Sequence, residues 1–205
     1  MQLARSLLGC VVVRVAPEGT LTAGAIVETE AYDGPADLAS HARFGRTART
    51  APMFGAGGHA YVYLIYGLHT CLNVVSGPEG RAGAVLVRAL APLLGEAVMR
   101  ERRGRPHDAA ARLAAGPGRL TQALAIGREL DGHDLTLPHQ LWLAGPPAAI
   151  SRRLRQDGIA VGPRIGVAYA GPRWATRPWR FGWRGHAALS RPFPGAAGEA
   201  GRGEP

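Results

Sequence analysis

The sequence predicts an α+β fold, a mostly antiparallel sheet with a few helices. Short runs rich in Val and Ile, separated by turn residues, fill the first 90 residues, while helical spacing begins only after Pro92. Strand-like segments then return after residue 140, and this order of elements is typical of the α+β class. We expect residues 1–189 to form one domain and residues 190–205, which are mainly Gly, Pro and Ala, to be a disordered tail.

The first half of the chain predicts two β-hairpins and a further strand. The strand-like segments are residues 7–15, 21–32, 59–75 and 84–89. Ala16-Pro17-Glu18-Gly19 is a typical turn between the first two, and Tyr66-Gly67-Leu68-His69 divides the third segment into a second hairpin. Residues 33–58 have the composition of a loop, and Arg88 interrupts the last strand.

The second half predicts helices over residues 93–103 and 118–126, the latter entered through Gly116-Pro117. Residues 104–115, between them, are expected to be a mobile basic loop. Further strand-like pieces are residues 141–143, 164–169 and 179–183.

The charge is strongly positive and unevenly placed. The chain has 24 basic and 15 acidic residues, a net charge of +9, and every basic residue is Arg. Residues 1–99 hold seven Arg and seven acids, whereas residues 100–205 hold 17 Arg and eight acids. Such a surface either is merely solvated or faces a polyanion, of which nucleic acid is the commonest. Because the chain has no Lys, none of its side chains can form a Schiff base.

Several kinds of site are disfavoured. No stretch approaches the roughly 20 apolar residues of a membrane helix, so we expect a cytoplasmic protein without a membrane partner. Cys10 and Cys71 lie too far apart in sequence to indicate a metal cluster or a disulfide framework. Residues 55–60 fit G-x-G-x-x-A but lead from a loop into a strand, unlike a dinucleotide-binding turn. His133 and His139 lie in a Pro-containing surface turn, so neither a metal nor a cofactor is expected.

A polar and aromatic group between residues 28 and 66 is the best candidate for chemistry. Glu28 and Glu30 point the same way from an extended strand, so both face water at a strand edge or both face a polar site. Four of the five tyrosines lie in this region, where they are either core residues or stacking surfaces: Tyr32, Tyr61, Tyr63 and Tyr66. Aromatic faces beside a carboxylate in a basic protein suit the extraction of a base from a duplex.

Six segments along nearly the whole predicted domain carry a resemblance to a known family. They are LARSLLGCVVVR (3–14), IVETEAYDGPADLASHAR (26–43), MFGAGGHAYVYLIYGLHTCLNV (53–74), VLVRALAPL (85–93), GPGRLTQALAI (116–126) and RIGVAYAGPRWATRPWRF (164–181). In these segments and in their order, the sequence resembles the alkyladenine (3-methyladenine) DNA glycosylases of the alkyl-purine type. The resemblance implies a monomeric, monofunctional enzyme that binds damaged double-stranded DNA, and a protruding β-hairpin that intercalates. Family members usually carry additional residues before the first segment, and Leu68, His69 and Thr70 stand where relatives often have larger or aromatic residues.

The resemblance also implies a role for each matching residue. Glu30 matches the general base that activates water, Arg88 matches the arginine that helps to hold this water and the DNA backbone, and the carbonyl of Ile165 matches a further water contact. The base-pocket residues implied are Tyr32, His41, Tyr63 and Asn73, of which the Asn73 amide disfavours normal guanine. Tyr66 matches the side chain that replaces the flipped nucleotide, and we expect Arg46 and Arg49 to contact the DNA backbone.

The implied reaction is hydrolysis of the N-glycosidic bond of an alkylated or otherwise damaged purine, which leaves an abasic site. Because the sugar carbon C1′ becomes cationic as the base leaves, an ionised Glu30 both stabilises this charge and orients water. Two alternatives stay open at this stage. A non-catalytic nucleic-acid-binding protein would need no carboxylate, and a hydrolase of free nucleosides would need no basic second half.

Overall fold

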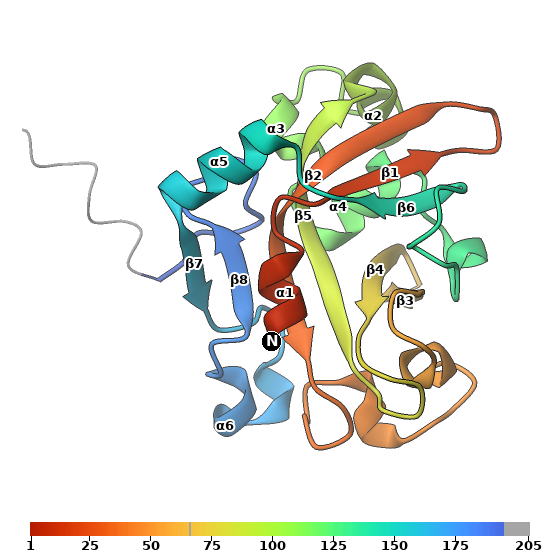
Figure 1. Cartoon of the computed structure of the whole chain (residues 1–205), viewed down its shortest axis with the longest axis vertical. Coiled ribbons are helices and arrows are strands. Elements are labelled where there is room, and N and C mark those ends of the chain that lie inside the picture. The colour runs from red at the N-terminus through yellow and green to blue at the C-terminus, as the bar shows by residue number, and fades with distance from the viewer. Residues whose placement is uncertain (66, 195–205) are drawn as a thin grey trace, which may run out of the picture.

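One long strand, β2 (Leu21–Tyr32), organises an antiparallel sheet around it. The computed structural model describes residues 1–65 and 67–194. Strands follow the order β3-β4-β5-β2-β1-β6, while β8 pairs with both β2 and β7 (Figure 1). The other strands are β1 (Val11–Val15), β3 (Ala60–Ile65), β4 (His69–Val75), β5 (Ala84–Leu94), β6 (Leu141–Ala144), β7 (Ile159–Gly162) and β8 (Arg180–Trp183). The α+β prediction is confirmed, and the two predicted pairs of antiparallel strands are present as β1–β2 and β3–β4. That the second hairpin protrudes and intercalates stays a prediction.

The two glutamates of β2 lie in the middle of this sheet. One edge of β2 pairs with β5, and the other pairs first with β1 and then, from Glu28 to Glu30, with β8. Both side chains are fully buried, so the interpretation of a solvated strand edge is wrong. The reason is tertiary, because β8 comes from the far end of the domain and covers an edge that the local sequence leaves open.

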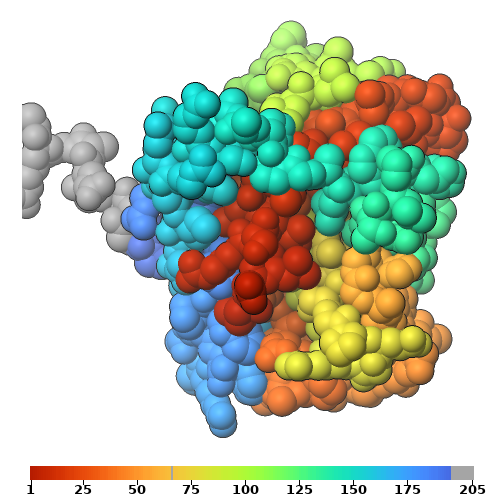
Figure 2. All heavy atoms as spheres, viewed as in Figure 1, coloured from red at the N-terminus to blue at the C-terminus, as the bar shows by residue number. Residues whose placement is uncertain are grey.

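Alternation along the strands separates a hydrophobic core from a polar face. Thr29 donates from Oγ1 to the carbonyl of Ala4 (2.7 Å) in α1 (Gln2–Ser6), and this short helix lies across the face seen in Figure 2, where the red N-terminal residues occupy the centre. Glu28 and Glu30, one residue before and after Thr29, share Arg88 as a partner on the opposite face. The main core gathers the residues that alternate with the polar set, among them Val62, Leu72, Val74, Val85 and Val87.

The remaining helices are α2 (Glu96–Arg103), α3 (Ala110–Leu113), α4 (Pro117–Ala123), α5 (Ala148–Asp157) and α6 (Pro172–Ala175). Short 3₁₀ turns are η1 (His41–Phe44), η2 (Ala51–Phe54), η3 (Arg128–Leu130) and η4 (Ala168–Ala170). Within residues 1–65 and 67–194, no helix is both long and apolar enough to cross a bilayer.

Three sequence predictions for the second half of the chain are wrong. Residues 104–115 are not a mobile loop throughout, because α3 buries Leu113 completely and Ala114 accepts a hydrogen bond from the Leu90 amide. Residues 164–169 are not a strand, since Gly166 has a positive φ of 76° and a 3₁₀ turn follows it. The helix predicted from residue 93 begins only at Glu96, because β5 continues through Pro92 beside a register shift.

The start of the predicted tail is packed against the domain. Phe193 is 5% exposed, and its ring lies over the guanidinium of Arg180 at 3.9 Å from the ring centroid. Ser190 donates from its backbone and its hydroxyl to Glu28. Residues 195–205, the rest of the predicted tail, lie outside the described residues.

Candidate active site

The carboxylate of Glu30 is the point where three separate segments meet. Its Oε1 accepts a hydrogen bond from the backbone N–H of Ile165 (2.7 Å) and lies 3.3 Å from Nη1 of Arg88, while Oε2 accepts one from the hydroxyl of Tyr32 (2.9 Å). The glutamate is fully buried, yet all three of these partners line an open cleft. The carboxylate is therefore fixed in orientation immediately behind the cleft wall.

Arg88 bridges the two glutamates of β2, which explains its position inside an apolar strand. Its Nε donates to Glu28 Oε1 (3.1 Å), and its Nη1 reaches Glu30. Burial by itself would lower the pKa of Arg88, but the charges of Glu30 and Glu28 outweigh this effect and raise it. The arginine therefore stays charged beside both carboxylates.

Glu28 is committed to contacts that leave it no access to the cleft. Its Oε1 accepts bonds from Arg88, from Arg180 Nε (2.7 Å) and from the Ser190 hydroxyl (2.8 Å), and its Oε2 accepts the Ser190 backbone N–H (2.6 Å). A buried carboxylate with this many donors is a structural acceptor. Both glutamates contact Arg88, but of the two only Glu30 also bonds Tyr32 and Ile165 of the cleft.

The cleft has a volume of about 580 Å³ and aromatic walls. Tyr32 lies on one side, and the rings of His41 and Tyr63 meet edge to face, with centroids 4.5 Å apart. A smaller cavity of about 40 Å³ adjoins its inner end, between these rings, Tyr61 and Asn73. The structure thus brings together the predicted pocket residues, although their roles rest on the resemblance.

His41 is held neutral at ordinary pH. Burial lowers its pKa to about 4, and the charges of Arg49 and Arg43 act in the same direction. Its Nδ1 shares a hydrogen bond with the hydroxyl of Tyr61 (3.0 Å), which fixes the ring plane. A neutral imidazole wall does not repel a cationic ligand in the cleft.

Asn73 and Cys71, two residues apart on the polar face of β4, are both constrained. The Asn73 amide donates from Nδ2 to the carbonyl of Tyr61 (3.0 Å), which anchors the side chain at the inner cavity. Burial raises the pKa of the Cys71 thiol to about 11, so this cleft-lining thiol stays protonated. A thiolate nucleophile is thereby disfavoured.

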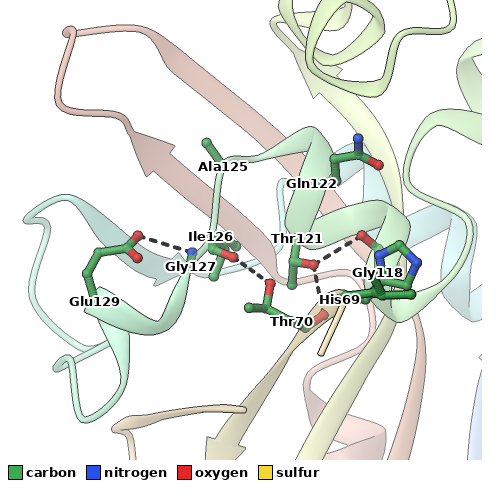
Figure 3. A pocket seen from close by; sticks show the side chains of 10 residues that line it. His69, Thr70, Gly118, Thr121, Gln122, Ala125, Ile126, Gly127 and Glu129 are labelled. Atoms are coloured by element: carbon green, nitrogen blue, oxygen red, sulfur yellow. Dashed lines mark hydrogen bonds between the residues drawn. The ribbon is translucent and has the colours of Figure 1, made fainter. Parts of the chain in front are cut away.

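The hairpin β3–β4 borders a second cleft of about 470 Å³ beside α4 (Figure 3). Thr70 donates from Oγ1 to the carbonyl of Ile126 (2.8 Å), and Thr121 donates from Oγ1 to the carbonyl of Thr70 (2.9 Å) (Figure 3). Leu68, at the turn, is 78% exposed. The turn end of the hairpin is thus tied to α4 and to the residue Ile126 that follows it, while Tyr66, the predicted intercalating residue, lies outside the described residues.

The loop after β2 carries the two arginines expected to contact DNA. Arg46 and Arg49 are both exposed, and the Arg49 guanidinium lies 5.6 Å from the centroid of the Tyr63 ring, at the cleft. Other residues also line the cleft that no sequence motif singled out, among them Phe44 and Tyr169. No local pattern distinguishes Tyr169, since only the fold brings its hydroxyl to the carbonyl of Ala39 (3.0 Å).

Known proteins match this chain over most of its length. The family model described as "Methylpurine-DNA glycosylase (MPG)" matches residues 1–187. Three similar relatives each bear the name "Putative 3-methyladenine DNA glycosylase". The protein of Anaeromyxobacter dehalogenans (strain 2CP-C) is 50% identical over 93% of this chain and 82% of its own length. That of Rubrobacter xylanophilus is 51% identical over 85% and 84%, and that of Methanocella arvoryzae is 45% identical over 95% and 92%.

Proposed function

Because the chain belongs to the methylpurine-DNA glycosylase family, we propose that it flips damaged purines out of duplex DNA and hydrolyses their N-glycosidic bond with a water activated by Glu30. As a family member, it is a hydrolase of N-glycosyl bonds in DNA that acts in repair. The observation that carries the proposal is the Glu30 carboxylate, held by Ile165, Arg88 and Tyr32 at the inner wall of an aromatic cleft.

The contacts of Glu30 favour one of its oxygens as the base. Oε1 already accepts from the Ile165 amide and faces Arg88, whereas Oε2 has only the Tyr32 hydroxyl as a partner among the described residues. The second lone pair of Oε2 is therefore the acceptor for a proton from water. The water oxygen bonds to C1′, the C1′–N bond breaks with its electrons passing to the purine, and the proton moves to Glu30.

The aromatic walls of the cleft suit a purine that is already cationic. Alkylation at N3 or N7 gives the base a positive charge, which makes it a good leaving group without a general acid. Electron-rich faces of Tyr32 and Tyr63 attract such a ring, and the neutral His41 does not oppose it. A purine alkylated at N3 or N7 is thus the lesion class that the walls favour.

In this proposal, two arginines of the loop after β2 and the predicted intercalating residue hold the duplex. Arg46 and Arg49 neutralise phosphates of the DNA backbone, and Tyr66 fills the gap that the extruded nucleotide leaves. We propose that the chain acts as a monomer. The product is a duplex with an intact strand and one abasic site.

The direct test uses duplex DNA treated with a methylating agent. After incubation with the protein, mass spectrometry of the small-molecule fraction identifies any released bases, and we expect 3-methyladenine and 7-methylguanine. Excess undamaged duplex should slow the release by competition. A hydrolase of free nucleosides would instead release purine from a free alkylated nucleoside, at a rate that undamaged duplex does not change. Absence of any released purine would contradict the proposal and favour a non-catalytic binding protein.

A further inference from the structure

A buried ion pair lies next to the cleft without contacting its interior. Arg164 donates from Nη2 to Asp37 Oδ1 (2.9 Å) and from Nη1 to Asp37 Oδ2 (2.5 Å), so the pair is bidentate. Neither side chain is exposed to solvent at all. The pair joins the loop after β2 to the segment before η4, which lie 127 positions apart in the sequence.

Arg164 contacts two elements of the site at once. Its Nη1 also donates to the carbonyl of Ala31 (2.9 Å), the residue between Glu30 and Tyr32. Its guanidinium stacks between the rings of Tyr32 (4.7 Å to the centroid) and Trp179 (4.9 Å). The next residue is Ile165, whose N–H bonds Glu30, so one side chain fixes a wall of the cleft and the donor to the carboxylate.

Asp37 in turn organises the loop that delivers His41. Its two oxygens accept the backbone N–H groups of Ala39 (3.0 Å) and Asp33 (3.3 Å). Ser40 then caps η1, which begins at His41, by accepting the N–H of Ala42 (3.1 Å). The carboxylate therefore holds the loop in a closed turn from which the His41 ring enters the cleft.

The energetics argue that the pair is kept for geometry. Removing two charges from water costs several kcal/mol per ion, and well-packed apolar side chains of similar volume are often as stable or more so. A bidentate arginine–carboxylate contact fixes the orientation of both side chains in one plane, whereas contacts between apolar side chains do not fix their orientation. The ion pair orients three groups of the cleft: the Tyr32 ring, the Ile165 amide and the loop that carries His41. The proposed reaction assigns a role to each of them.

We propose that Asp37 and Arg164 are positioning residues for base excision, which set the Tyr32 ring, the Ile165 amide and the His41 loop relative to Glu30. The inference rests on the proposed function. Neither residue touches the reacting atoms, so the effect is on the rate of the chemical step more than on the binding of DNA. A displacement of about 1 Å at a reacting centre can cost as much as 100-fold in rate.

The test compares Arg164→Lys and Asp37→Asn with the wild-type chain in single-turnover excision of 7-methylguanine from a duplex. Lys keeps the charge but loses the bidentate fork, and Asn keeps the bond from the Ala39 amide but loses the charge. We expect the rate at saturating enzyme to fall about 10- to 100-fold in each variant. The enzyme concentration that gives half the maximal rate should change by no more than about threefold.

Thr29→Val is the matched control for reduced stability. It deletes the buried hydrogen bond to Ala4 on the opposite face of β2, next to Glu30 in sequence but without contact to the cleft. We expect it to lower the melting temperature while leaving the excision rate within twofold. Rates are compared at a temperature where all variants are folded by circular dichroism.

The double variant, Arg164→Lys with Asp37→Asn, shows whether the two residues act together as one ion pair or independently. Because both substitutions disrupt one contact, we expect the double variant to be no slower than the slower single variant. Rates within twofold of wild type in both single variants would overturn the proposal, as would decreases no larger than that of Thr29→Val at equal melting temperature. Failure of the wild-type chain to release the base would instead refute the proposed function.

Discussion

The backbone N–H of Ile165 donates a 2.7 Å hydrogen bond to Oε1 of Glu30, although the two residues lie 135 positions apart in the chain. The resemblance assigns the carbonyl of Ile165 to the attacking water, and that role stays a prediction. The amide group of the same residue supplies a different function, since it stabilises the ionised carboxylate in one orientation. The backbone N–H of Ile165 thus orients the carboxylate of Glu30, the proposed base.

Glu30→Gln should abolish base release and leave binding to damaged duplex within a few-fold. The amide keeps the shape of the side chain but loses the charge that orients water and stabilises the cationic sugar. Single-turnover excision measures the rate, and fluorescence anisotropy with a lesion-containing duplex measures binding. Retention of more than a few per cent of the wild-type rate would remove Glu30 as the base.

Glu28→Gln should act mainly on stability. Arg88 and Arg180 would lose their shared buried carboxylate, a class of change that costs about 3–5 kcal/mol of unfolding free energy. Urea unfolding followed by circular dichroism measures this decrease. The folded variant should still release base, because Glu28 meets the cleft only through Arg88, which keeps its ion pair with Glu30. Complete inactivity of the folded protein would transfer the base role to Glu28.

His41 should make the folded state less stable as pH falls. Its pKa is lowered to about 4 in the fold, against about 6.5 in an unfolded chain, so the unfolded state binds more protons between these values. Its contribution is therefore present above pH 6.5 and is lost progressively towards pH 4. Urea midpoints of wild type and His41→Gln should converge over that range, and a constant difference between them would contradict the buried neutral ring.

Binding to undamaged duplex should fall steeply with salt, and Arg46 and Arg49 should account for part of the slope. Removing one arginine that neutralises a phosphate lowers the slope of log affinity against log salt by about 0.9. Titrations of Arg46→Ala and Arg49→Ala at several salt concentrations measure it. Arg153→Ala on α5, where the guanidinium pairs with Asp157, is the exposed control; equal slopes in all variants would exclude both loop arginines from the DNA interface.

Borohydride added during turnover should trap no protein–DNA adduct. Glycosylases that cut the strand attack C1′ with an amine, usually Lys, and this chain has no Lys. Arg stays protonated and is not nucleophilic, so the remaining amine that could attack is that of Met1. Denaturing electrophoresis of the reduced mixture should show only free protein and an intact abasic strand. An adduct would mean that Met1 reaches the sugar.

Elements with local signals could be predicted from the amino-acid sequence. The alternating runs on either side of Ala16–Gly19 predicted the first hairpin, and those around residues 66–69 predicted the second, because side chains repeat every two residues along a strand. The same alternation correctly placed Glu28 and Glu30 on one face. The candidate pocket and catalytic residues came from the resemblance to a family, because the periodicity of a strand does not assign a chemical role to a side chain.

The environment of those residues, in contrast, depends on contacts between distant segments. The β8 strand covers the edge of β2 beside Glu28, and Arg164 reaches Asp37 across more than a hundred residues. A segment such as 164–169 resembles a strand when its apolar content is counted alone. It does not form a strand, because Gly166 has a positive φ of 76° and a 3₁₀ turn follows it. The carboxylate that pairs with Arg164 at its start lies in the loop after β2, which no neighbouring residue in the sequence reveals.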